Sequence, residues 1–279
     1  MDGEEQSRAG ERAFGPAAVI DYGETVLRFM DRYVRGVDNG VDREPPVRVF
    51  VMGENAWRDA DRWPLPGTTP RTLFLAGAAS PDVGRLDWRQ APGGGAVSAF
   101  LSDPAHPVED PHAADPGAHD YRQLVERKDL AAFETAPFGS DLRVVGRMSA
   151  EMYVSTADAR DVDIWVKLFD VAPDGTAFNL MSPGLDVVRA SYRAGGPRRR
   201  LLRPGHVYAL PFENLLTGNT FLEGHRLRLV VCGAFFPHFS RNLQTGELET
   251  VSAVSRPGLV HVHHSSRYPS RLVLPVVSP

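Results

Sequence analysis

The sequence predicts a mainly β protein, a β-sandwich preceded by a single αβ unit. In residues 161–181, apolar side chains fall at every second position until Pro173-Asp174-Gly175, a combination typical of a tight turn, so this stretch predicts a β-hairpin. Residues 142–154 alternate in the same way over a longer run. The 26 glycines and 23 prolines interrupt the chain as often as in all-β proteins. Strands with one apolar face require a second sheet to cover it, which predicts the sandwich.

The N-terminal residues differ from the rest of the chain in their predicted secondary structure. Residues 1–13 are polar and predict a disordered tail. Residues 16–35 predict a helix that a proline can start and a glycine can end, and residues 47–53 predict a strand, so residues 14–53 form one αβ unit. An isolated unit of this kind cannot bury both of its faces. We therefore expect a large exposed apolar patch and a missing neighbour upstream.

The remainder divides into a connector, residues 54–69, and the sandwich, residues 70–279. Residues 77–120, 194–205 and 237–253 are expected to be mainly loops, the second of them rich in arginine. The strand count fits a jelly roll. The expected strands are 71–76, 97–101, 142–154, 162–171, 184–193, 206–212, 225–233, 258–263 and 271–277.

Charge and composition exclude several classes of protein. The net charge of −4 argues against nucleic-acid or membrane partners. The single cysteine, Cys232, excludes an intrachain disulfide and most cysteine-based metal sites, and we expect it to be a buried strand residue. No secretory signal and no run of 18 apolar residues is found, so a cytoplasmic location is expected.

Several stretches then match a known family in the family's own order. These stretches are F-M-D-R-Y-V-R-G (29–36), P-P-V-R-V-F-V-M-G-E-N-A-W-R-D (45–59), W-P-L-P (63–66), R-K-D-L-A-A-F-E-T (127–135), D-V-D-I-W-V-K-L-F-D-V-A-P-D-G (161–175), G-H-R-L-R-L (224–229), F-P-H-F-S-R-N-L-Q-T-G (236–246) and P-S-R-L-V-L-P-V (269–276). With them the chain resembles the C-terminal portion of the cocaine esterase and X-prolyl dipeptidyl-peptidase family, the CocE/NonD serine hydrolases.

The resemblance implies how the chain is organised. Family members have an α/β-hydrolase domain, a helical cap and a C-terminal jelly roll of galactose-binding-like fold. By this comparison residues 14–53 are the last helix and strand of the hydrolase sheet, and residues 70–279 are the jelly roll. After a D-P-x-x-P-V pattern, residues 102–126 depart from the glycine-rich continuation of the family, so their expected place near the active-site cleft is open.

The resemblance also implies which residues are missing. The family's nucleophile lies on a G-x-S-x-G elbow, and no serine or cysteine of this chain has glycines at that spacing. The family's acid and histidine precede the region of the match. We therefore predict no catalytic, cofactor-binding or metal-binding residue and no cofactor. We expect the chain alone to be inactive, although whether it belongs to an enzyme remains open.

Polar clusters leave alternatives open. Three histidines among four aspartates could form a metal site, but their spacing fits no recognised site and favours a solvated loop: His106, His112 and His119 with Asp103, Asp110, Asp115 and Asp120. Other groups have structural interpretations that we favour over a binding or catalytic one. These groups are an edge strand (His261, His263, His264), a corner (His238, Ser240, Arg241, Asn242) and a solvated loop (Arg193, Arg198, Arg199, Arg200, Arg203).

Two functional hypotheses follow. In the first, the chain completes an α/β-hydrolase domain supplied by another polypeptide, or self-associates through residues 16–53. In the second, it is a non-catalytic jelly-roll module that binds carbohydrate or a protein, which rests on fold analogy alone.

Overall fold

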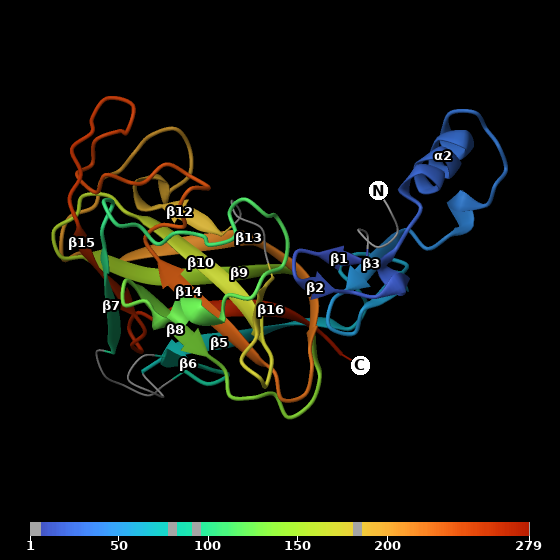
Figure 1. Cartoon of the computed structure of the whole chain (residues 1–279), viewed down its shortest axis with the longest axis horizontal. Helices are drawn as coiled ribbons and strands as arrows, with labels where there is room; N and C mark the ends of the chain where they lie inside the picture. Colours follow the sequence, from blue (N-terminus) through green and yellow to red (C-terminus); the bar gives the residue numbers. More distant parts are fainter. Residues whose placement is uncertain (1–6, 78–82, 91–95, 181–185, 279) are drawn as a thin grey trace.

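The computed structural model describes residues 7–77, 83–90, 96–180 and 186–278, and it confirms the mainly β fold. Figure 1 shows a β-sandwich with a smaller N-terminal module, residues 7–60, at one end. The strands of the sandwich are β5 (Thr68–Ala76), β6 (Val83–Asp87), β7 (Val97–Ser102), β8 (Leu130–Glu134), β9 (Leu142–Thr156), β10 (Asp163–Val171), β11 (Ala177–Asn179), β12 (Val187–Arg189), β13 (Tyr208–Phe221), β14 (Arg226–Cys232), β15 (Gly258–His263) and β16 (Arg271–Val277).

The sandwich is one path of hydrogen-bonded strands folded on itself. The path runs β11-β10-β14-β8-β6-β5-β16-β9-β15-β7, with β12 beside β10 and β13 beside β9. Strand β6 pairs antiparallel with β5 and parallel with β8, so it joins the two layers at one edge. Leu73 and Met152 of one layer share a buried cluster with Ile164 and Leu229 of the other, which places the core between the layers.

The predicted strands were correct in place but wrong in some of their ends. The strand predicted at 206–212 continues to Phe221, because a bulge between Phe212 and Leu215 restores its pairing with β9. The strand predicted at 184–193 is only β12, which a 3₁₀ turn at Ala190–Tyr192 follows; its first two positions lie outside the described residues. Strands β6 and β8 were not predicted, whereas β11 pairs antiparallel with β10 as the second strand of the predicted hairpin.

Strand β10 is buried on both faces, although its sequence places the charged residues Asp163 and Lys167 on the outward face. Its inward residues, such as Val166, pack in the central core. Its outward residues, Trp165 and Phe169, pack against Tyr121 and Phe235, which belong to loops that cross the outside of the layer. The outer face of β10 is therefore the surface on which those loops pack.

The predicted disordered tail was wrong for residues 7–13. These residues form a short hairpin, β1 (Arg8–Ala9) and β2 (Arg12–Ala13). The Arg12 guanidinium is buried and donates to Asp170 Oδ2 at 3.4 Å and to Asn219 Oδ1 at 3.0 Å. This charge-assisted anchoring to the sandwich offsets the entropy lost on ordering a polar segment. Residues 1–6 lie outside the described residues.

The αβ unit has the predicted element types with different bounds and pairing. Helix α2 spans Tyr22–Tyr33 rather than 16–35, because Asp21 caps it by accepting a hydrogen bond from Glu24 N at 2.8 Å. A 3₁₀ turn, η1 (Pro16–Ala18), precedes it. Strand β3 (Val47–Val51) pairs antiparallel with β4 (Ala56–Ala60), so the predicted connector contains a strand.

Backbone contacts join this module to the sandwich. Met52 N donates to Gly218 O at 2.9 Å, and Thr220 N donates to Met52 O at 2.8 Å. Gly53 has a φ of 85° and lies so close to the β13 backbone that an added Cβ would be 2.0 Å from Thr220 O. Only glycine fits this junction.

Helix α2 contributes no buried residue, and Figure 1 shows it projecting from the sandwich. The expected exposed apolar patch is therefore confirmed. Its members, here called the α2 patch, are Tyr22, Val26, Leu27, Phe29, Met30, Tyr33 and Val34. Among the described helices, none has the length and apolar character required to cross a lipid bilayer.

Candidate functional site

Four histidines of the sandwich have a side-chain hydrogen-bond partner of one kind each: His263 and His264 pair with serines, and His225 and His238 pair with aspartates. Ser155 Oγ lies 2.8 Å from His263 Nε2, and Ser98 Oγ lies 3.1 Å from His264 Nε2. Across the described ranges, no hydrogen-bonded chain joins a serine, an imidazole and a carboxylate. Burial raises the pKa of the Cys232 thiol to about 12, so this residue is no thiolate nucleophile.

The loop of residues 103–121 meets the N-terminal hairpin beside a cavity of about 630 Å³. Residues from both segments line this cavity, Glu11 from the hairpin and Asp110, His112 and Tyr121 from the loop. Because the loop packs on the outer face of β10, its polar side chains are held in place by a rigid sheet. This cavity and its rim form the candidate site.

Asp110 is held in the cavity wall by three hydrogen bonds to its side chain. Its carboxylate accepts hydrogen bonds from His238 Nε2 at 2.6 Å, from the Tyr121 hydroxyl at 2.8 Å and from the backbone N–H of His112 at 2.9 Å. Burial acts to raise the pKa of Asp110, but these hydrogen bonds outweigh it and hold the pKa below the ordinary value. Burial, reinforced by the Asp110 carboxylate, raises the pKa of Tyr121.

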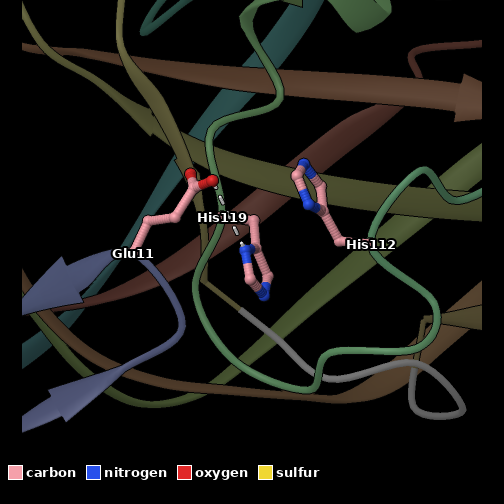
Figure 2. Close-up of side chains that lie close together, drawn as sticks. All are labelled: Glu11, His112 and His119. Carbon is pink, nitrogen blue, oxygen red and sulfur yellow. Dashed lines mark ion pairs between the residues drawn. The ribbon is translucent and has the colours of Figure 1, made fainter.

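Two of the three loop histidines meet at the rim with a glutamate from the hairpin. Figure 2 shows Glu11, His112 and His119, which each offer one ligand atom such that the three atoms lie within 4.8 Å of one another. The His112 and His119 rings stack with centroids 4.3 Å apart. His106 is not part of this group, because it is exposed and pairs with Asp103. Sequence reasoning missed Glu11, which carries no signal in a polar tail.

Other candidate residues have structural partners. Asn242 Nδ2 donates to Asp163 Oδ1 at 2.9 Å and Arg241 donates to Pro104 O at 2.7 Å, which supports the interpretation of a structural corner. Arg199 reaches buried Asp161 at 2.9 Å, so it does not belong to a solvated loop. Arg198 is exposed, as expected.

Comparisons with known proteins agree with this architecture. The family described as X-Pro dipeptidyl-peptidase C-terminal non-catalytic domain matches residues 39–273. A cocaine esterase from Rhodococcus sp. (strain MB1 Bresler) is 33% identical over 296 residues, covering 97% of this chain and 49% of the relative. The chain therefore spans about half the length of this relative.

Solved structures show the same relation. An aminopeptidase from the marine sediment archaeon Thaumarchaeota archaeon superposes with a TM-score of 0.77 at 26% identity, covering 92% of this chain and 44% of that one. A CocE/NonD family hydrolase from Staphylococcus aureus superposes with a TM-score of 0.65 at 18% identity, covering 92% and 46%, which bears on the fold alone.

Proposed function

Because this chain belongs to the family of X-Pro dipeptidyl-peptidase C-terminal non-catalytic domains, we propose that it completes an α/β-hydrolase domain lying outside these 279 residues. In this role its residues 14–53 contribute to the hydrolase sheet, and the chain performs no bond cleavage itself. The single observation that carries the proposal is the α2 patch, an apolar surface that none of the described residues covers.

The α2 patch has the character of an interior surface. Phe29 is 54% exposed, Met30 47% and Tyr33 59%, although aromatic and long apolar side chains of this kind are usually buried. The patch lies on a short helix that precedes β3 in the chain, an order of elements that fits the edge of an α/β layer. Burial of such a surface stabilises an assembly by roughly 25 cal/mol per Å².

The reaction of the complete protein is also a proposal. The relatives are named an esterase and an aminopeptidase, so we infer ester or X-Pro peptide hydrolysis for the whole enzyme. The nucleophile, base and acid then come from the hydrolase domain, on this polypeptide or a second one. We place the protein in the cytoplasm, since a single buried cysteine is typical of chains that need no disulfide.

The test is an activity assay on the purified 279-residue chain with a p-nitrophenyl ester, an X-Pro p-nitroanilide and a fluorophosphonate label. We expect no turnover and no label, whereas full-length cocaine esterase as the positive control shows both. A serine that the fluorophosphonate labels within this chain would refute the proposal. The alternative, a carbohydrate- or protein-binding module, has no specific observation in its favour, and a glycan array without hits would count against it.

A further inference from the structure

The group of Glu11, His112 and His119 at the cavity rim has features of a metal-binding site. It lies apart from the α2 patch, and neither the family match nor the resemblance assigns it a role. His119 is almost fully buried, with a relative exposure of 2%, and its Nδ1 forms no hydrogen bond. A buried ring nitrogen without a hydrogen-bonding partner is costly unless something else satisfies it.

The tautomer of the neutral His119 ring follows from the hydrogen bond of its Nε2. Nε2 lies 2.7 Å from the backbone carbonyl oxygen of Asp115. A carbonyl oxygen can only accept, so Nε2 carries the hydrogen, and in the neutral ring Nδ1 presents a lone pair. The same arrangement, one ring N–H bonded to a carbonyl and the other nitrogen free, fixes histidine ligands in metal proteins.

Glu11 supplies a second lone-pair donor in a fixed position. Its Oε2 accepts the backbone N–H of Asp120 at 2.8 Å, which leaves Oε1 facing His119 Nδ1 at 3.8 Å. This separation is too long for a shared hydrogen bond. It is close to the separation of about 3.3 Å between two ligands bound tetrahedrally to one zinc ion.

The backbone around the pair is held rigidly. Glu11 N donates to Ala118 O at 2.8 Å, and His119 N donates to Asn179 Oδ1 at 2.8 Å. Gly10 has a φ of 58°, and an added Cβ would be 2.8 Å from the His119 ring. Both ligand-bearing segments are therefore positioned before any ion arrives, which lowers the cost of binding.

His112 is the third donor and the adjustable one. It is half-buried, and its ring lies parallel to that of His119, so it must rotate about its side-chain bonds to direct a nitrogen at a shared ion. We propose that Glu11, His112 and His119 bind a first-row transition-metal dication, with Zn²⁺ the best match to two imidazoles and one carboxylate. Such three-ligand sites keep a fourth position open, and two of the three proposed ligands, Glu11 and His112, line the cavity.

The proposed ion ties the N-terminal hairpin to loop 103–121. Two imidazoles argue against Ca²⁺ and Mg²⁺, which prefer oxygen ligands. The competing explanation is a metal-free pair, in which a protonated His119 attracts Glu11 without binding any ion. Metal titration separates these explanations.

The experiment uses the full chain, without a polyhistidine tag and dialysed against a chelator, titrated with Zn²⁺ by calorimetry and with Co²⁺ by visible absorption. Glu11→Gln and His112→Gln remove one donor each, at positions that are not fully buried, so both variants should fold. His106→Gln is the matched control, an exposed histidine of the same loop.

We expect one Zn²⁺ per chain and an imidazole-bound Co²⁺ spectrum for the wild type and the control. Each variant should bind about tenfold or more weakly and lose the Zn²⁺-dependent rise in Tm. Absence of stoichiometric binding by the wild type would overturn the proposal in favour of the metal-free pair. Equal Zn²⁺ affinity of the wild type and either variant would overturn the three-ligand site.

Discussion

Individual polar residues of this protein find partners far away in the chain. Arg12 reaches Asp170 and Asn219, and Arg199 reaches Asp161. The sequence showed Arg199 only as one member of a basic loop, because its partner lies 38 positions earlier and on another element. Pairing of this kind offsets the cost of burying a charge, which would be too high for an unpaired group.

At the residue scale, His264 predicts a pH dependence of stability. Burial lowers its pKa, and neighbouring His263 lowers it further. The folded pKa therefore lies below the unfolded value of about 6.5, so the unfolded chain binds the proton more readily. The stability associated with neutral His264 is complete above about pH 6.5 and is lost as the pH falls below it through the folded pKa.

Urea unfolding at about pH 7.5 and about pH 5.5 measures this contribution. We expect the loss of free energy of unfolding between the two values to be smaller in His264→Gln than in the wild type. The exposed-site variant His106→Gln should retain the wild-type loss. An unchanged loss in His264→Gln would show that other groups account for the pH dependence.

At the scale of elements, α2 and the β3–β4 pair behave differently from the strands of the sandwich. Strand β3 meets the sandwich through Met52 and Gly53, whereas α2 buries no side chain. The pattern of apolar residues predicted the helix, but not what covers it, because no residue that the structure describes buries this helix. A helix of this kind depends on a partner for most of its stability.

Self-association through α2 is the element-scale prediction for the isolated chain. Phe29→Glu combined with Tyr33→Glu should shift the protein toward monomer, as measured by sedimentation velocity. Because neither side chain is buried, the free energy of unfolding should change by less than about 0.5 kcal/mol for each substitution. The control is Arg35→Glu, an exposed charge change beside the patch, which should leave the association unchanged. Persistent self-association of the double variant would assign the contact to another surface.

At the scale of the whole molecule, the two layers of the sandwich are one continuous hydrogen-bonded unit. Strand β6 joins the layers, and the central core takes side chains from strands of both layers, from β5 to β16 in chain order. The N-terminal module is attached at one end of this unit (Figure 1). Such an arrangement predicts cooperative unfolding of the sandwich and local opening of the helix.

Hydrogen exchange checks this difference in stability. We expect the amides of α2 to exchange orders of magnitude faster than those of β9 and β10, because opening the helix exposes no buried side chain. Strand β3, fastened to β13, should show intermediate protection. Protection of α2 equal to that of β10 in a monomeric sample would contradict the prediction.

The sequence by itself determined the fold class, the positions of most strands, the hairpin of β10 and β11, and the family. These are local consequences of side-chain alternation and turn residues, or of ordered motifs. Only the tertiary structure decided what the polar residues do. It brought Glu11 beside His112 and His119, ordered residues 7–13 around Arg12, and buried the outer face of β10, because contacts between distant segments leave no periodic signal in the chain.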